Sequence, residues 1–153
     1  MATNTSLLTD EVKEVNKVGG RTINRRVNGI KSMFDEEGDD THCFVDKSIA
    51  GIIAKLAEGG NTPWTSCSGL RADHPDCKTP HYRAYLGCKV LGRKVELAAK
   101  TAGFRVEPSH HGGVLLYAWP EKNFIPVVPR GAEKILSHMW SVFAAQIGAQ
   151  FPT

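Results

Sequence analysis

The sequence predicts one compact α/β domain, with an α+β arrangement as the variant, in which helices flank a mixed sheet of about four or five strands. Apolar residues recur at helical spacing along Ile49–Leu56, Gly92–Ala102 and Ile135–Ile147. Short runs rich in strand-forming residues lie between these stretches. The 153 residues fall within the usual size of one domain, and no linker, repeat or low-complexity tract divides them.

Within this domain we expect an N-terminal helical segment over 1–40, an α/β core over 41–130 and a C-terminal helix over 131–149. In the first segment, a short helix over 9–18 ends at a glycine pair. A second helix follows because four apolar residues recur at helical spacing and basic residues lie off that stripe. The apolar residues are Ile23, Val27, Ile30 and Phe34, and the basic ones are Arg21, Arg25, Arg26 and Lys31.

The core elements follow from the same patterns. A helix carrying Ile49 to Leu56 is expected to begin at Asp46 or Ser48 and to end at Gly59–Gly60. Polar, proline-containing loops are expected over 69–80 and 120–129. Strands are expected at His42–Val45, Trp64–Cys67, Tyr82–Val90, Phe104–Val106 and Val114–Trp119.

Composition indicates an ordinary globular protein, with 41% hydrophobic and 23% charged residues. The formal charge of +3 permits an anionic partner without requiring one. No run approaches the roughly 20 apolar residues of a membrane-spanning helix, and the N-terminus lacks the pattern of a signal peptide. We therefore expect a soluble, cytoplasmic protein whose four cysteines are thiols or metal ligands rather than disulfides.

The segment Thr65–Gly69 is the first candidate site. Small hydroxyl- and thiol-bearing residues, Ser66, Cys67 and Ser68, run from an extended segment into Gly69. Such a turn can present N–H groups and hydroxyls to an anion or a polar ligand edge. The alternative is an ordinary exit from a strand, with the small residues buried.

Titratable residues are dense in the loop that follows. Arg71, Asp73 and His74 lie there, and loops on a rigid scaffold often carry binding groups. His110 and His111, on a glycine-flanked turn, are candidates for a general base or for hydrogen bonds to a ligand, or are simply polar turn residues.

A metal site is the competing interpretation of the same loop. Cys67, His74, Cys77 and His81 are acceptable zinc ligands, and Cys88 is a possible substitute. Their spacing matches no standard finger or knuckle, so free thiols and no bound metal are the expectation. A serine or cysteine nucleophile would need a base that only the fold can deliver.

Three stretches, taken in order, give a resemblance to a known family. They are Val45–Ile49 with the apolar helix after it, the Thr65–Gly69 turn, and Ala98–Ala99 with Ala102–Arg105. They resemble the corresponding stretches of the tRNA wybutosine-synthesising methyltransferases, whose distinctive motif is Ser-Cys-Ser-Gly. The likeness spans about half of the chain, residues 45–119. Leu70 stands where that family has an arginine, and the Asp73-His74-Pro75 extension departs from its pattern.

The resemblance implies an α/β fold, methylation of a modified guanosine of tRNA by S-adenosyl-L-methionine, and a pocket at Ser66, Cys67, Ser68, Gly69 and Arg105. The leading hypothesis is a protein that binds a nucleoside or nucleotide on such a scaffold, with Trp64 or Tyr82 stacking on the base. It is expected to sequester a small nucleotide signal without a required cofactor. The alternatives are the S-adenosyl-L-methionine-dependent tRNA methyltransferase and a zinc-stabilised interaction module. A homo-oligomer is compatible with each, and no membrane partner is expected.

Overall fold

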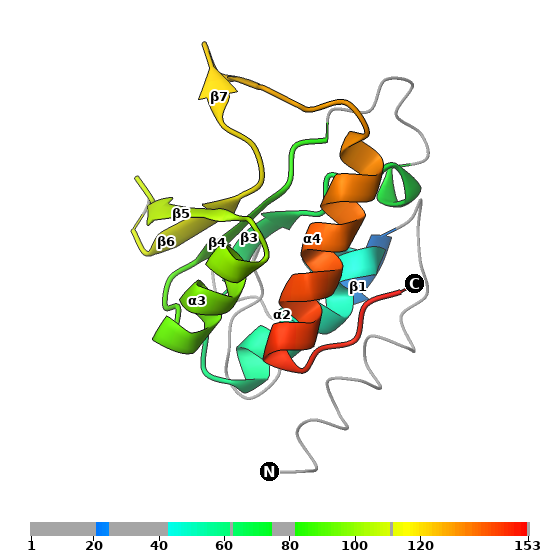
Figure 1. Cartoon of the computed structure of the whole chain (residues 1–153). Coiled ribbons are helices and arrows are strands. Elements are labelled where there is room, and N and C mark those ends of the chain that lie inside the picture. The colour runs from blue at the N-terminus through cyan, green and yellow to red at the C-terminus, as the bar shows by residue number, and fades with distance from the viewer. Residues whose placement is uncertain (1–20, 25–42, 62, 75–81, 111, 153) are drawn as a thin grey trace.

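The structure is a computed structural model that describes residues 21–24, 43–61, 63–74, 82–110 and 112–152. Helices pack on one side of a four-stranded sheet, which confirms the predicted combination of helices and sheet (Figure 1). The sheet has the order β3–β4–β6–β5, and every pairing in it is antiparallel. Its strands are β3 (Pro63–Cys67), β4 (Tyr85–Cys88), β5 (Arg105–Pro108) and β6 (Val114–Tyr117).

Antiparallel pairing is where the sheet departs from the mixed sheet that we expected. Each strand runs opposite to its neighbours in the sheet, which gives the α+β form of the fold. One row of the register joins Leu86 to Ser66 and Leu116, and the next joins Tyr85 to Cys67 and Tyr117. Because side chains alternate along a strand, these two rows lie on opposite faces of the sheet.

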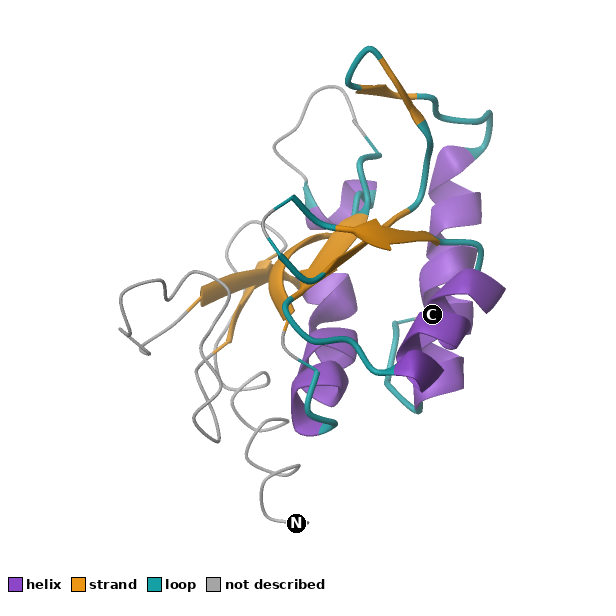
Figure 2. Cartoon of the chain, turned by 90° about the vertical axis from the view of Figure 1, so that its left-hand side faces the viewer, coloured by secondary structure: helices purple, strands orange, loops and turns teal. Residues whose placement is uncertain are grey.

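Three helices supply the other side of the core, namely α2 (Ala50–Glu58), α3 (Arg93–Thr101) and α4 (Ala132–Ile147). Figure 2 shows these helices gathered on one side of the sheet. The longest, α4, buries Leu136, Trp140 and Phe143, which share one face of a helix because they are four and three residues apart. Trp140 lies against Phe104 with ring centroids 4.7 Å apart, so the helix is anchored on the chain just before β5.

The three predicted helices and the predicted strands of the core are confirmed, with boundaries shifted by a few residues. A 3₁₀ turn over Lys47–Ile49 precedes α2, so Asp46 lies at the start of this helical stretch, as predicted. The loop predicted over 120–129 instead contains a short hairpin of β7 (Glu121–Lys122) and β8 (Ile125–Pro126). It projects from the body of the molecule at the top of Figure 2.

The prediction of a helix beginning near residue 21 is wrong. Arg21–Asn24 form β1, which pairs in antiparallel fashion with β2 (Cys43–Asp46). Pairing with a segment about twenty residues away along the chain overrides the local helical spacing. The predicted helix over 9–18, and the rest of the one expected to residue 34, lie outside the described residues. Across the described part of the chain, no helix has the length and apolar character needed to cross a membrane.

Candidate functional site

The Ser-Cys-Ser-Gly turn lies at the end of β3, where the chain leaves the sheet and approaches α4. Gly69 has a φ of +72°, a conformation that glycine adopts without strain. A Cβ atom there would stand 3.0 Å from the backbone of Tyr82 and Arg83 and from the side chain of Leu136. Trp140 donates from Nε1 to the carbonyl oxygen of Ser68 over 2.8 Å, which fixes the turn to the helix. The glycine is therefore required by the shape of the turn and by its close packing.

Ser68 is the centre of a buried hydrogen-bond network and has no exposed surface. Its hydroxyl donates to Oδ2 of Asp73 over 2.6 Å and accepts from the N–H of Leu70. The other oxygen of Asp73 accepts two bonds from Ser48, one from its N–H and one from its hydroxyl, both at 3.0 Å. Asp73 therefore ties the turn to the start of α2.

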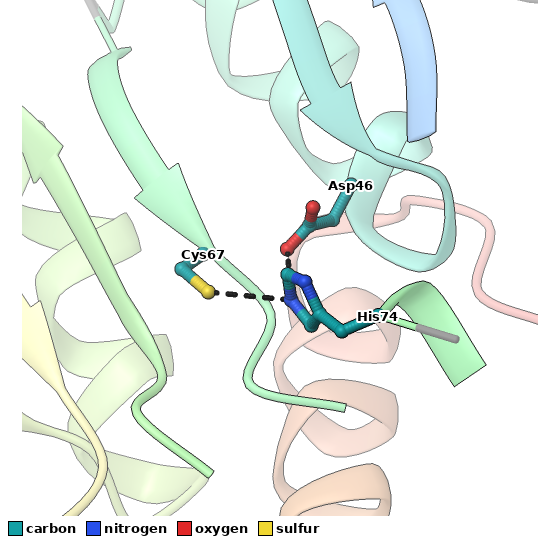
Figure 3. Close-up of side chains that lie close together, drawn as sticks. All are labelled: Asp46, Cys67 and His74. Atoms are coloured by element: carbon teal, nitrogen blue, oxygen red, sulfur yellow. Dashed lines mark hydrogen bonds and ion pairs between the residues drawn. The ribbon is translucent and has the colours of Figure 1, made fainter. Parts of the chain in front are cut away.

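Asp46 joins the turn from the opposite side. Its Oδ2 accepts the N–H of Ser68 over 2.8 Å and lies 3.1 Å from Nε2 of His74. The same Nε2 lies 3.5 Å from Sγ of Cys67. Figure 3 shows the three side chains of Asp46, Cys67 and His74 converging from three separate segments of the chain. Asp46 is the last residue of β2, Cys67 is the last residue of β3, and His74 follows a 3₁₀ turn over Arg71–Asp73.

The charge at this turn is negative on its inner side. Burial raises the pKa of Asp73 above its ordinary value, even though the hydrogen bonds from Ser68 and Ser48 lower it, and the nearby Asp46 raises it further. A phosphate placed against the turn would meet these two carboxylates. The geometry therefore gives Ser68 and Asp73 an organising role within the fold, rather than a surface that a ligand can reach.

A second group of candidate residues lies on the sheet. Cys67 on β3, Tyr85 on β4, Tyr117 on β6 and Arg105 on β5 are directly paired across all four strands. This row brings together two of the positions that the family resemblance implies, Cys67 and Arg105. They stand at opposite edges of the sheet, about 14 Å apart given an interstrand spacing of about 4.8 Å.

The remaining candidates are dispersed. Arg71 is exposed, and its N–H donates to the carboxylate of Glu133 on α4. His110 is exposed on the turn between β5 and β6, which is at the far end of these strands from Arg105. Cys77, His81 and His111 lie outside the described residues.

Sequence reasoning missed several residues of the site. The sequence predicts Asp46 and Ser48 only as the start of a helix, and no sequence pattern singles out Trp140. Trp64 and Tyr82 were expected to stack on a base, whereas Tyr85 and Tyr117 occupy the central positions of the row. The carbonyl of Tyr82 accepts a hydrogen bond from Trp119, and Trp64 lies beneath Nζ of Lys89, 4.8 Å from the ring centroid. Alternation along the two strands was the signal that would have found both tyrosines.

Comparison with protein-family models, with curated protein sequences and with solved structures finds no match to this chain, so the candidate sites rest on the geometry described above.

Proposed function

We propose that the protein binds the base of a nucleoside or nucleotide on the sheet face that carries Tyr85, Tyr117 and Arg105, called here the tyrosine row. The observation that supports this is the register, which pairs Tyr85 with Tyr117 and Tyr117 with Arg105. The row lies on the face opposite Leu86 and Leu116, which are buried beneath the helices.

The spacing of the two tyrosines suits an aromatic ligand. Directly opposed residues of antiparallel strands have Cβ atoms about 4.5–5.5 Å apart, so the two rings occupy one continuous patch. Tyr85 and Tyr117 are both half-buried, so neither residue is closed off from solvent. A base stacked on an aromatic side chain gains about 1–3 kcal/mol, largely independent of the identity of the base.

The charges beside the row are balanced. Arg105 is exposed, and its positive charge lowers the pKa of Tyr117, whose hydroxyl is hydrogen-bonded to Glu107. Burial is the largest cause that raises the pKa of Tyr117, and the hydrogen bond to Glu107 raises that pKa further. Nη1 of Arg83 forms an ion pair with Oε1 of Glu121 at 3.5 Å, and the negative charge of Glu121 raises the pKa of Tyr117. The charges of Arg83 and Arg105 are offset by Glu121 and Glu107, which favours recognition of a base and a ribose, with at most a single phosphate near Arg105.

In this arrangement the Ser-Cys-Ser-Gly turn supports the site from behind. Ser68 and Gly69 hold the end of β3 to α4, and the register of β3 places Cys67 beside Tyr85. Sequestration of the ligand requires only the tyrosine row. Methyl transfer from S-adenosyl-L-methionine is the alternative outcome, since a methyl donor must be placed against the acceptor on the same surface.

Calorimetry with guanosine, guanosine monophosphate and S-adenosyl-L-methionine tests the proposal. Replacing Tyr117 by alanine should weaken the binding of guanosine by about 5- to 150-fold, the equivalent of about 1–3 kcal/mol. Tyr117→Phe keeps the ring and should change the affinity by less than about threefold. Arg105→Ala should weaken the monophosphate more than guanosine, and Arg93→Ala, an exposed arginine on α3, serves as its control.

Two results would contradict the proposal. One is the absence of binding by all three compounds at millimolar concentration. The other is binding that is unchanged in the Tyr85→Ala, Tyr117→Ala double variant. Binding and turnover of S-adenosyl-L-methionine with a guanosine acceptor would identify the methyltransferase instead.

A further inference from the structure

We infer that Asp46, Cys67 and His74 form a binding site for one Zn²⁺ ion, called here the Asp-Cys-His cluster. This site is separate from stacking on the tyrosine row, and neither proposal requires the other. The three ligand atoms, Oδ of Asp46, Sγ of Cys67 and a ring nitrogen of His74, all lie within 4.8 Å of one another.

The distances fit a single ion at the centre of the cluster. Usual zinc bond lengths and tetrahedral angles place sulfur about 3.6 Å from nitrogen and oxygen about 3.3 Å from nitrogen. The structure has 3.5 Å between Cys67 Sγ and His74 Nε2, and 3.1 Å between Asp46 Oδ2 and the same Nε2. Two edges of the coordination tetrahedron are therefore already close to their final lengths.

A Cys-His-Asp catalytic relay is the other arrangement these residue types suggest, and the geometry disfavours it. In a relay, the nucleophile and the orienting carboxylate hydrogen-bond to different ring nitrogens of the histidine. Here both Cys67 and Asp46 approach the same atom, Nε2 (Figure 3). Convergence on one nitrogen is the arrangement that a shared metal ion produces.

The donor set selects the metal. Thiolate and imidazole are ligands of zinc, whereas Mg²⁺ and Ca²⁺ bind oxygen. Oδ2 of Asp46 accepts the N–H of Ser68 over 2.8 Å, the kind of outer hydrogen bond that orients a metal-binding carboxylate. Asp46 and Asp73 are each 2% exposed and both hydrogen-bond to Ser68, so a divalent cation would offset two neighbouring buried carboxylates.

Binding has a defined proton balance. The Cys67 thiol transfers its proton to solvent as sulfur bonds to the metal. Asp46 would bind as a carboxylate and His74 through Nε2 with the ring proton on Nδ1, so neither of them releases a proton. Three protein donors leave the fourth position of the ion to a donor outside this cluster, such as water.

Metal titration of the full-length chain tests the inference. Protein freed of metal by a chelator should bind one equivalent of Zn²⁺ in competition with a chelating dye, and metal analysis after gel filtration should give the same ratio. Co²⁺ in place of Zn²⁺ should give the visible bands of a tetrahedral site and a sulfur-to-cobalt charge-transfer band. Calorimetry in buffers of different ionisation enthalpy should show release of a proton from the thiol.

Variants locate the site. His74→Ala and Cys67→Ser should each weaken zinc binding by about 100-fold or more, and Cys67→Ser should remove the charge-transfer band. Cys88→Ala removes a buried thiol of the same sheet and should change neither the affinity nor the band. Circular dichroism of the metal-free variants establishes that they are folded.

The inference is overturned by wild-type protein that retains less than about a tenth of an equivalent of zinc. It is equally overturned when folded His74→Ala binds zinc as tightly as the wild type. In both cases the guanosine titrations remain valid, because Tyr85 and Tyr117 are outside the cluster.

Discussion

Replacing Ser68 by alanine is the most direct test of the network that organises the turn. The change removes a hydroxyl that donates to Asp73 over 2.6 Å and accepts from the N–H of Leu70 over 3.1 Å. A hydrogen bond to a charged group contributes about 1.5–3 kcal/mol, and a buried N–H left without an acceptor costs at least about 1 kcal/mol. Leu70 is itself buried, so water does not replace the lost acceptor. We expect the free energy of unfolding to fall by about 3 kcal/mol.

Two further variants make this expectation specific. Ser48→Ala removes only the hydroxyl bond to Asp73 and keeps the bond from the N–H, so its cost should be about half as large. Ser137→Ala changes a half-buried serine on α4 and should alter stability by less than about 0.5 kcal/mol. Urea unfolding followed by tryptophan fluorescence measures all three, and about 3 kcal/mol corresponds to a midpoint shift of roughly 1.5 M for an m-value near 2 kcal/mol/M. The reasoning is refuted when Ser68→Ala is no more destabilising than Ser137→Ala, or less so than Ser48→Ala.

Two other perturbations probe the sheet. Gly112 and Gly113 both have positive φ, but a Cβ on Gly113 would overlap the carbonyl oxygen of Cys88, whereas one on Gly112 meets nothing within 4 Å. Gly113→Ala should therefore cost at least about 2 kcal/mol more than Gly112→Ala in thermal or urea unfolding, and equal costs would contradict the packing of this turn. Burial raises the pKa of Cys88 from 9.0 to about 12, so its thiol stays protonated in the folded protein while the unfolded chain ionises as pH rises above 9. Stability should fall by about 1.4 kcal/mol between pH 7 and pH 10 through this group alone, and the fall should be smaller by that amount in Cys88→Ala, measured in reducing buffer; identical pH dependence would refute the assignment.

The helices were predictable because their signals are local. The apolar spacing of Ile49, Ile52, Ile53 and Leu56 marks the buried face of α2, and Gly59 follows its last residue. The same holds for α4, which ends at Gly148 in a left-handed conformation. Such patterns depend on neighbours three or four residues away, so the sequence alone contains them.

The elements that failed depend on distant partners. Arg21–Asn24 form a strand because β2 pairs with them, and two-residue strands such as β7 carry almost no periodic signal. The site behaves in the same way. Asp73 and His74 were predictable because titratable residues are dense in that loop. Asp46 was not, because it bonds to Ser68, which lies 22 residues away along the chain. Only the tertiary fold shows that these carboxylates share one network.

Cys67 is a ligand of the Asp-Cys-His cluster and also borders the tyrosine row, which decides how the two sites can be separated. It is paired with Tyr85 in the sheet, and its sulfur lies 3.5 Å from Nε2 of His74. A Cys67 variant therefore disturbs the edge of the tyrosine row together with the Asp-Cys-His cluster, and a combined loss of both activities would distinguish nothing. Tyr117→Ala changes only the tyrosine row, and His74→Ala changes only the Asp-Cys-His cluster. Loss of guanosine binding in the first and of zinc binding in the second, each with the other ligand still bound, is the pattern that two independent sites require.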